Sequence, residues 1–151
     1  MNFSFYNPTR LIFGAGSLAR LGEVAGTLGK KALIVTGGGS VKRNGTFDRA
    51  VASLSAAGIA SVECDGVEPN PRISTVRRGA QIVRDENCDV IIALGGGSTM
   101  DAAKVMAAAV FYQGDPWDMI LHGQSQPYMP TRALPIITVP TLAATGSEMN
   151  S

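Results

Sequence analysis

Histidine and cysteine are scarce in this sequence of 151 residues. The single histidine, His122, has no second histidine with which to hold a metal, so we predict no metal ligand in this chain. Two cysteines, Cys64 and Cys88, are too few for a disulfide framework and lie beside apolar segments, which predicts buried, unreactive thiols. No pairing of a serine or cysteine with histidine is supported, so we name no catalytic residue.

Signals for a membrane or a nucleic acid are absent too. Lys104 interrupts the longest apolar stretch, so none reaches the roughly 18 residues of a membrane span, and the N-terminus lacks the pattern of a signal peptide. A net charge of +1 gives no reason to expect nucleic acid or an anionic membrane as a partner. We therefore expect a cytoplasmic protein that binds neither.

What the chain does contain is an alternation of short apolar runs with helix-forming segments. The predicted strands, some clear and some weak, lie at 10–13, 31–36, 61–65, 89–94 and 135–140. Helical spacing of apolar residues marks 18–28, 44–57, 71–83 and 101–111. This order predicts an α/β fold, a Rossmann-like parallel sheet with helices on both faces, formed by one domain over residues 1–151.

Three glycines and a serine, Gly95, Gly96, Gly97 and Ser98, stand where a buried strand must turn into a helix. Without Cβ atoms, this turn lets a ligand approach the backbone, and Ser98 is placed to cap the helix. The free N–H groups at the start of the helix, with its dipole, favour an anion such as a pyrophosphate. A tight turn without a ligand is the plainer alternative, but three glycines carry an entropic cost that such a turn does not require.

The same stretch resembles the G-G-G-S-x-x-D-x-A-K motif of the iron-containing (group III) alcohol dehydrogenases, which are related to glycerol dehydrogenase and dehydroquinate synthase. The matching residues are Gly95, Gly96, Gly97, Ser98, Asp101, Ala103 and Lys104. Three further stretches, 7–16, 36–40 and 140–148, also resemble the family. Four motifs in this order are a poor fit to a chance match. The chain looks closest to the bacterial NADPH-dependent aldehyde reductase or butanol dehydrogenase branch.

This resemblance implies hydride transfer between a nicotinamide cofactor and a small alcohol or aldehyde, with a divalent metal, iron or zinc, as Lewis acid. Family members hold the metal with one Asp and three His of a helical second domain. Residues 141–151 contain Ser147 and Glu148, which should begin another helix, so we expect this chain to be only the cofactor half and inactive alone. Members of this family typically form homodimers, and the extended N-terminal segment could form a strand pair between subunits.

The turn formed by Gly37, Gly38, Gly39 and Ser40 is expected to lie near the adenosine ribose. NAD-using relatives tend to carry Asp at the place of Gly37, and a carboxylate there repels a 2′-phosphate. Here the glycines and Ser40 are followed by Lys42 and Arg43, which favours NADP over NAD. The alternative is that both cations are ordinary solvated side chains.

Further cofactor contacts are implied by the resemblance, and each also has a purely structural explanation. Asn70 can serve as a helix cap, and Asp101 suits the dipole of the helix start. A polar turn after an edge strand accounts equally for the group that matches the loop beside the nicotinamide, namely Thr138, Thr141, Leu142, Thr145 and Ser147. Two other functions stay open: a lyase of the dehydroquinate synthase type that holds NAD tightly, and a binding domain without catalysis.

Overall fold

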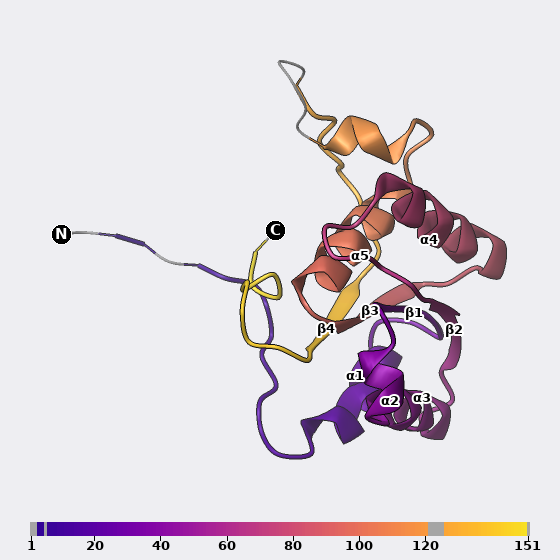
Figure 1. The fold of residues 1–151 in the computed structure, drawn as a ribbon, viewed down its shortest axis with the longest axis vertical. Helices are drawn as coiled ribbons and strands as arrows, with labels where there is room; N and C mark the ends of the chain where they lie inside the picture. The colour runs from indigo at the N-terminus through magenta and orange to yellow at the C-terminus, as the bar shows by residue number, and fades with distance from the viewer. Residues whose placement is uncertain (1–2, 5, 121–125, 151) are drawn as a thin grey trace.

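The computed structural model describes residues 3–4, 6–120 and 126–150. Its sheet has four parallel strands in the order β2-β1-β3-β4 (Figure 1). The strands are β1 (Lys31–Thr36), β2 (Ala60–Cys64), β3 (Val90–Gly95) and β4 (Ile136–Pro140). The helices are η1 (Ser17–Arg20), α1 (Leu21–Gly26), α2 (Ser40–Arg43), α3 (Thr46–Ala56), α4 (Ile73–Glu86), α5 (Gly97–Ala109) and η2 (Pro116–Met119).

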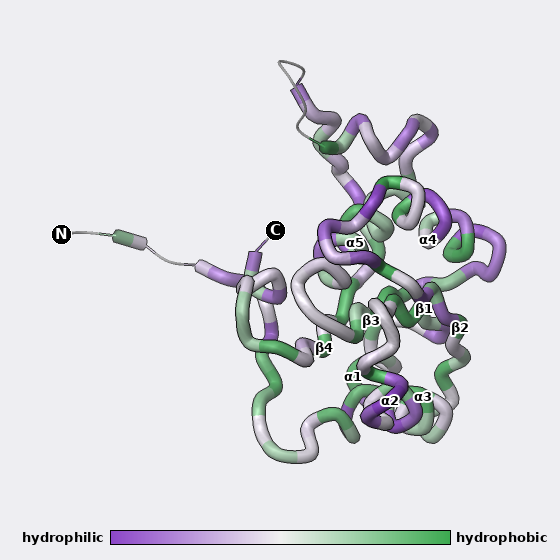
Figure 2. The backbone as a smooth tube through the Cα atoms, viewed as in Figure 1, coloured by the Kyte–Doolittle hydropathy of each residue, from purple (hydrophilic) through white to green (hydrophobic). Residues whose placement is uncertain are grey.

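Helices cover both faces of this sheet, which confirms the predicted fold class. Alternate residues of each central strand point to opposite sides, so Leu33 of β1 packs with α4 and α5, whereas Ile34 packs with α1, α2 and α3. Strands β1 and β3 are buried on both faces, as their β-branched composition predicts. Figure 1 shows the two helical layers, and Figure 2 shows hydrophobic backbone segments meeting at the sheet between them.

The strand order creates a switch point between β1 and β3. From β1 the chain crosses to β2 on one side, and then returns to form β3 on the other side. The ends of the two inner strands are therefore neighbours, with Thr36 opposite Leu94 in the parallel register. In open α/β sheets, a crevice forms outside the carboxyl ends of the strands at such a point. Both glycine-rich turns emerge there.

The N-terminal segment does not form the predicted strand at 10–13. Residues 6–13 carry no strand and run away from the sheet, with Phe13 94% exposed. An extended segment becomes a strand only by pairing with another, and this one pairs with none of the four described strands. This segment contacts a part of the chain that is distant in sequence, because the Asn7 amide nitrogen donates a hydrogen bond to the Met149 carbonyl oxygen at 2.9 Å.

Two predicted helix caps are also wrong. Helix α4 begins at Ile73 with Arg72 as its N-cap, because Asn70 adopts a left-handed conformation with φ of 54° in the preceding turn. Ser98 lies inside α5, where its hydroxyl oxygen accepts from the Asn70 backbone N–H at 3.4 Å. The N-cap of α5 is Gly96. The helix expected after β4 is likewise not formed over residues 141–150.

Candidate functional site

A cleft of about 360 Å³ lies outside the carboxyl ends of β1 and β3. It contains both glycine-rich turns, although they are more than 50 residues apart in sequence. The predicted site residues that line it are Gly37, Gly38, Ser40, Gly95, Gly96, Gly97, Ser98 and Leu142. The lining residues that were not predicted are Val41, Val67, Pro69, Leu94 and Thr99. These additions are mostly apolar, and no local sequence signal distinguishes them from ordinary core residues.

The three glycines where β3 turns into α5 serve different purposes. A Cβ on Gly95 would lie 2.6 Å from the Thr99 hydroxyl oxygen, and one on Gly97 would collide with Thr145. Packing therefore requires glycine at both positions. Gly96 differs, because a Cβ there would meet no atom of the described residues within 4 Å and its φ of −90° suits any residue. Its missing side chain leaves open space in the cleft rather than relieving a clash.

The start of α5 supplies hydrogen-bond donors to this space. The N–H groups of Thr99 and Met100 donate to the Gly96 carbonyl oxygen at 3.1 and 3.2 Å, which closes the first turn. The N–H groups of Gly97 and Ser98 precede that turn and have no intrahelical acceptor. No side chain that the structure describes caps this helix. Its 13 residues align their dipoles with the positive end at the cleft, which favours an anionic ligand.

At the turn after β1, the two cations predicted to face a phosphate are arranged differently. The Lys42 ammonium lies 2.8 Å from a carboxylate oxygen of Glu63, and this hydrogen-bonded pair raises the pKa of Lys42. The Arg43 guanidinium instead donates to the Gly38 carbonyl oxygen at 3.4 Å. Among the described residues, no carboxylate lies within ion-pair distance of Arg43. Arg43 is thus the cation beside this turn whose charge stays uncompensated.

Glu63 and Asp65 are the charged neighbours that the sequence pattern did not reveal. Glu63 lies on β2, and its second carboxylate oxygen accepts from the Thr36 hydroxyl at 2.8 Å. Asp65 follows β2 and lies 3.9 Å from Lys42 and 3.6 Å from Arg78. A signal was available, because two acidic residues at the end of a strand must lie near the ends of its neighbours in a parallel sheet.

The remaining predicted residues surround the cleft without lining it. The Asn70 N–H reaches Ser98, the Thr141 N–H donates to the Gly95 carbonyl oxygen at 3.0 Å, and Asp101 is exposed on α5. Thr145 and Ser147 share a hydroxyl hydrogen bond of 2.8 Å against Gly97. The other two are Gly39, which turns the backbone with φ of 89°, and Thr138, which pairs with Ala93 in the sheet.

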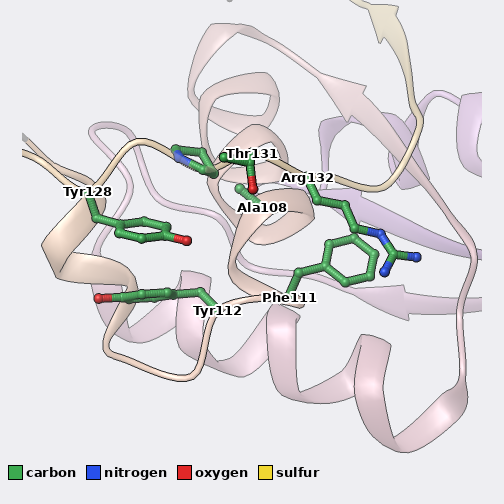
Figure 3. A pocket seen from close by; sticks show the side chains of 7 residues that line it. Ala108, Phe111, Tyr112, Tyr128, Thr131 and Arg132 are labelled. Carbon is green, nitrogen blue, oxygen red and sulfur yellow. The ribbon is translucent and has the colours of Figure 1, made fainter.

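A second cavity of about 250 Å³ lies at the opposite end of α5 (Figure 3). Tyr112 and Tyr128 stack in its wall with ring centroids 4.2 Å apart, and the Arg132 guanidinium lies 4.0 Å from the centre of the Phe111 ring. These contacts satisfy the aromatic and cationic side chains within the wall itself. The cavity contains none of the predicted site residues.

Neither a metal-binding cluster nor a membrane-spanning helix is found among residues 3–4, 6–120 and 126–150. There, no three His, Cys, Asp or Glu residues are grouped so that they could hold a metal ion. His122, the only histidine, lies outside the described residues. No described helix combines the length and apolarity needed to cross a membrane.

Comparison with known proteins gives the class to which this fold and cleft belong. The sequence model of the family described as iron-containing alcohol dehydrogenase matches residues 8–151, and the chain belongs to this family. A probable NADH-dependent butanol dehydrogenase of Bacillus subtilis is 49% identical over 99% of this chain and 38% of its own length. An NADPH-dependent aldehyde reductase of Escherichia coli is 38% identical, over 99% of this chain and 38% of its length.

A solved structure agrees with these sequence relatives. The crystal structure of an NADH-dependent butanol dehydrogenase from Thermotoga maritima superposes with a TM-score of 0.91 at 42% identity, covering 99% of this chain and 37% of that chain. The chain therefore spans less than two fifths of the length of the relatives it matches. Their names include both NADH and NADPH as cofactor, so the family alone does not decide between them.

Proposed function

We propose that this chain forms the dinucleotide-binding part of a metal-dependent alcohol dehydrogenase or aldehyde reductase. The observation that carries the proposal is the meeting of two glycine-rich turns at the switch point, with open space over Gly96 and the start of α5. In such an enzyme the cofactor supplies the hydride chemistry, and the protein supplies binding and orientation.

In this proposal, each part of the cofactor has its own place along the cleft. The pyrophosphate lies against the N–H groups of Gly97 and Ser98, and the adenosine ribose lies at the turn after β1. The nicotinamide end extends toward β4 and the loop that follows it. The proposed cofactor contacts are Gly37, Gly38, Gly39, Ser40, Asn70, Gly95, Gly96, Gly97, Ser98, Asp101, Thr138, Thr141, Leu142, Thr145 and Ser147.

NADP is the cofactor that we propose over NAD. The turn itself holds no carboxylate, and Arg43 keeps an uncompensated charge beside it, both of which favour a 2′-phosphate. The pairing of Lys42 with Glu63 neutralises one of the two cations on which the sequence-based prediction relied. The preference for NADP should therefore be modest.

The rest of the proposed activity rests on family membership. A divalent metal, iron or zinc, would polarise the carbonyl of a small aldehyde or bind the hydroxyl oxygen of a small alcohol. Among the described residues of this chain, no group of side chains could hold it. We propose a homodimer as the assembled enzyme. In it the described residues of this chain bind and orient the cofactor.

Calorimetric titration of the 151-residue chain with NADP and with NAD tests the proposal. Saturable binding of both, with the lower dissociation constant for NADP, is the expected result. A chain that is folded by circular dichroism but binds neither dinucleotide contradicts the proposed function. Tighter binding of NAD contradicts only the cofactor preference.

A further inference from the structure

Beyond the turn residues, a network of charged side chains links β2 to the turn after β1. Glu63 divides its two carboxylate oxygens between Thr36, the residue directly before Gly37, and Lys42 of α2. The side chain of Glu63 is 24% exposed and that of Lys42 is 43% exposed, so the pair is partly screened from water. Lys42 also lies 5.3 Å from the centre of the Phe47 ring.

Lys42 is close to the turn in sequence, but its ammonium is paired with Glu63. Lys42 follows Ser40 by two residues, and its ammonium is joined to Thr36 through a single carboxylate. A lysine has a flexible four-carbon stem, so an unpaired ammonium at this position can swing toward a nearby phosphate. The second carboxylate near it, Asp65, is 3.9 Å from the ammonium and is shared with Arg78.

We propose that Glu63 is a positioning residue that limits the preference for NADP by holding Lys42 away from the turn formed by residues 37–40. The proposal rests on the proposed function, because it assumes that the adenosine ribose lies at this turn. Glu63 neutralises Lys42 and leaves only Arg43 for a 2′-phosphate. NAD has no 2′-phosphate, so its binding does not depend on this choice.

The test is Glu63→Gln, which keeps the shape of the side chain and its acceptor for Thr36 but removes the charge that holds Lys42. Dissociation constants for NADP and NAD are measured on parent and variant at one ionic strength. We expect NADP to bind roughly three- to tenfold more tightly, the effect of one partly exposed charge pair, and NAD to change by less than about twofold.

Two further variants separate this role from a general effect of charge. Glu86→Gln removes the same charge from a comparable pair, with Lys31 at 2.6 Å, but at the amino end of β1, and should leave the NADP-to-NAD ratio unchanged. The double variant Glu63→Gln with Lys42→Met has the same net charge as the parent and should return the ratio to the parent value.

The outcomes distinguish this inference from the function beneath it. If the parent binds neither dinucleotide, the proposed function fails and the inference fails with it. If the parent binds both and Glu63→Gln leaves the ratio unchanged, only the role of Glu63 is refuted. An equal gain in Glu86→Gln, or a gain that persists without Lys42, also overturns it. Thermal unfolding of each variant confirms that the binding values come from folded protein.

Discussion

Replacement of Gly96 by valine is the sharpest test of the phosphate site. Within the described part of the chain, a Cβ at this position meets no atom within 4 Å, and the backbone there is extended with ψ of −171°. The fold should therefore accept valine, a β-branched residue that favours extended backbone. Removing a glycine also restricts the unfolded chain, so the free energy of unfolding should stay within about 1 kcal/mol of the parent value.

Binding should respond very differently. A side chain on Gly96 projects into the cleft beside the N–H groups of Gly97 and Ser98, where a phosphate oxygen must come within about 3 Å of each nitrogen. Hydrogen bonds to a charged group contribute about 1.5–3 kcal/mol each. Loss of two such bonds amounts to about 3–6 kcal/mol, which raises the dissociation constant by more than about 100-fold.

Calorimetric titration with NADP and thermal unfolding of the same samples provide the two measurements. Gly26→Ala on α1 is the matched control, because its Cβ would lie 3.8 Å from the Ile59 side chain, in ordinary contact. Neither binding nor stability should change much in this variant. A Gly96→Val chain that binds NADP within threefold of the parent refutes the phosphate assignment. A variant that fails to fold refutes our account of the open space.

Three other predictions concern cofactor choice, packing and the thiols. Gly37→Asp should invert the preference from NADP to NAD, because a carboxylate at the turn repels the 2′-phosphate. Dissociation constants of both cofactors on parent and variant test this, and a parent that already binds NAD more tightly contradicts it. Gly22→Ala should lower the free energy of unfolding, measured by urea titration, by about 1–3 kcal/mol, because its Cβ would overlap the Ser53 carbonyl oxygen. An unchanged free energy of unfolding contradicts the close packing of α1 against α3. Burial raises the pKa of Cys88 to about 11 and also raises the pKa of Cys64, so iodoacetamide at pH 8 should leave both unmodified in native protein, as mass spectrometry would show. Because the folded state favours the neutral thiol, stability should fall as the pH rises from 9.0 toward 11, and stability that increases over that range contradicts this.

The buried strands and the two turns were readable from the sequence because their signals are local. A run such as 31–36 is β-branched and apolar on both sides, and β1 has the predicted bounds. Both cysteines are buried, at 0% and 6% exposure for Cys64 and Cys88, as their apolar surroundings predicted. Helix boundaries were less accurate, since Asn70 fits a cap and a left-handed turn equally well and only its contact with Ser98 decides between them.

The sequence by itself determined the α/β alternation, the buried strands and the presence of two glycine-rich turns, because residue propensity and apolar spacing act within a few neighbours along the chain. Only the tertiary structure decided that β1 and β3 lie next to each other, which brings the two turns into one cleft. It also decided that Gly96 alone among three identical neighbours faces open space, and that Glu63 engages Lys42. Such facts depend on which distant segments pack together, and strand order is set by the burial of the whole sheet rather than by any single stretch of sequence.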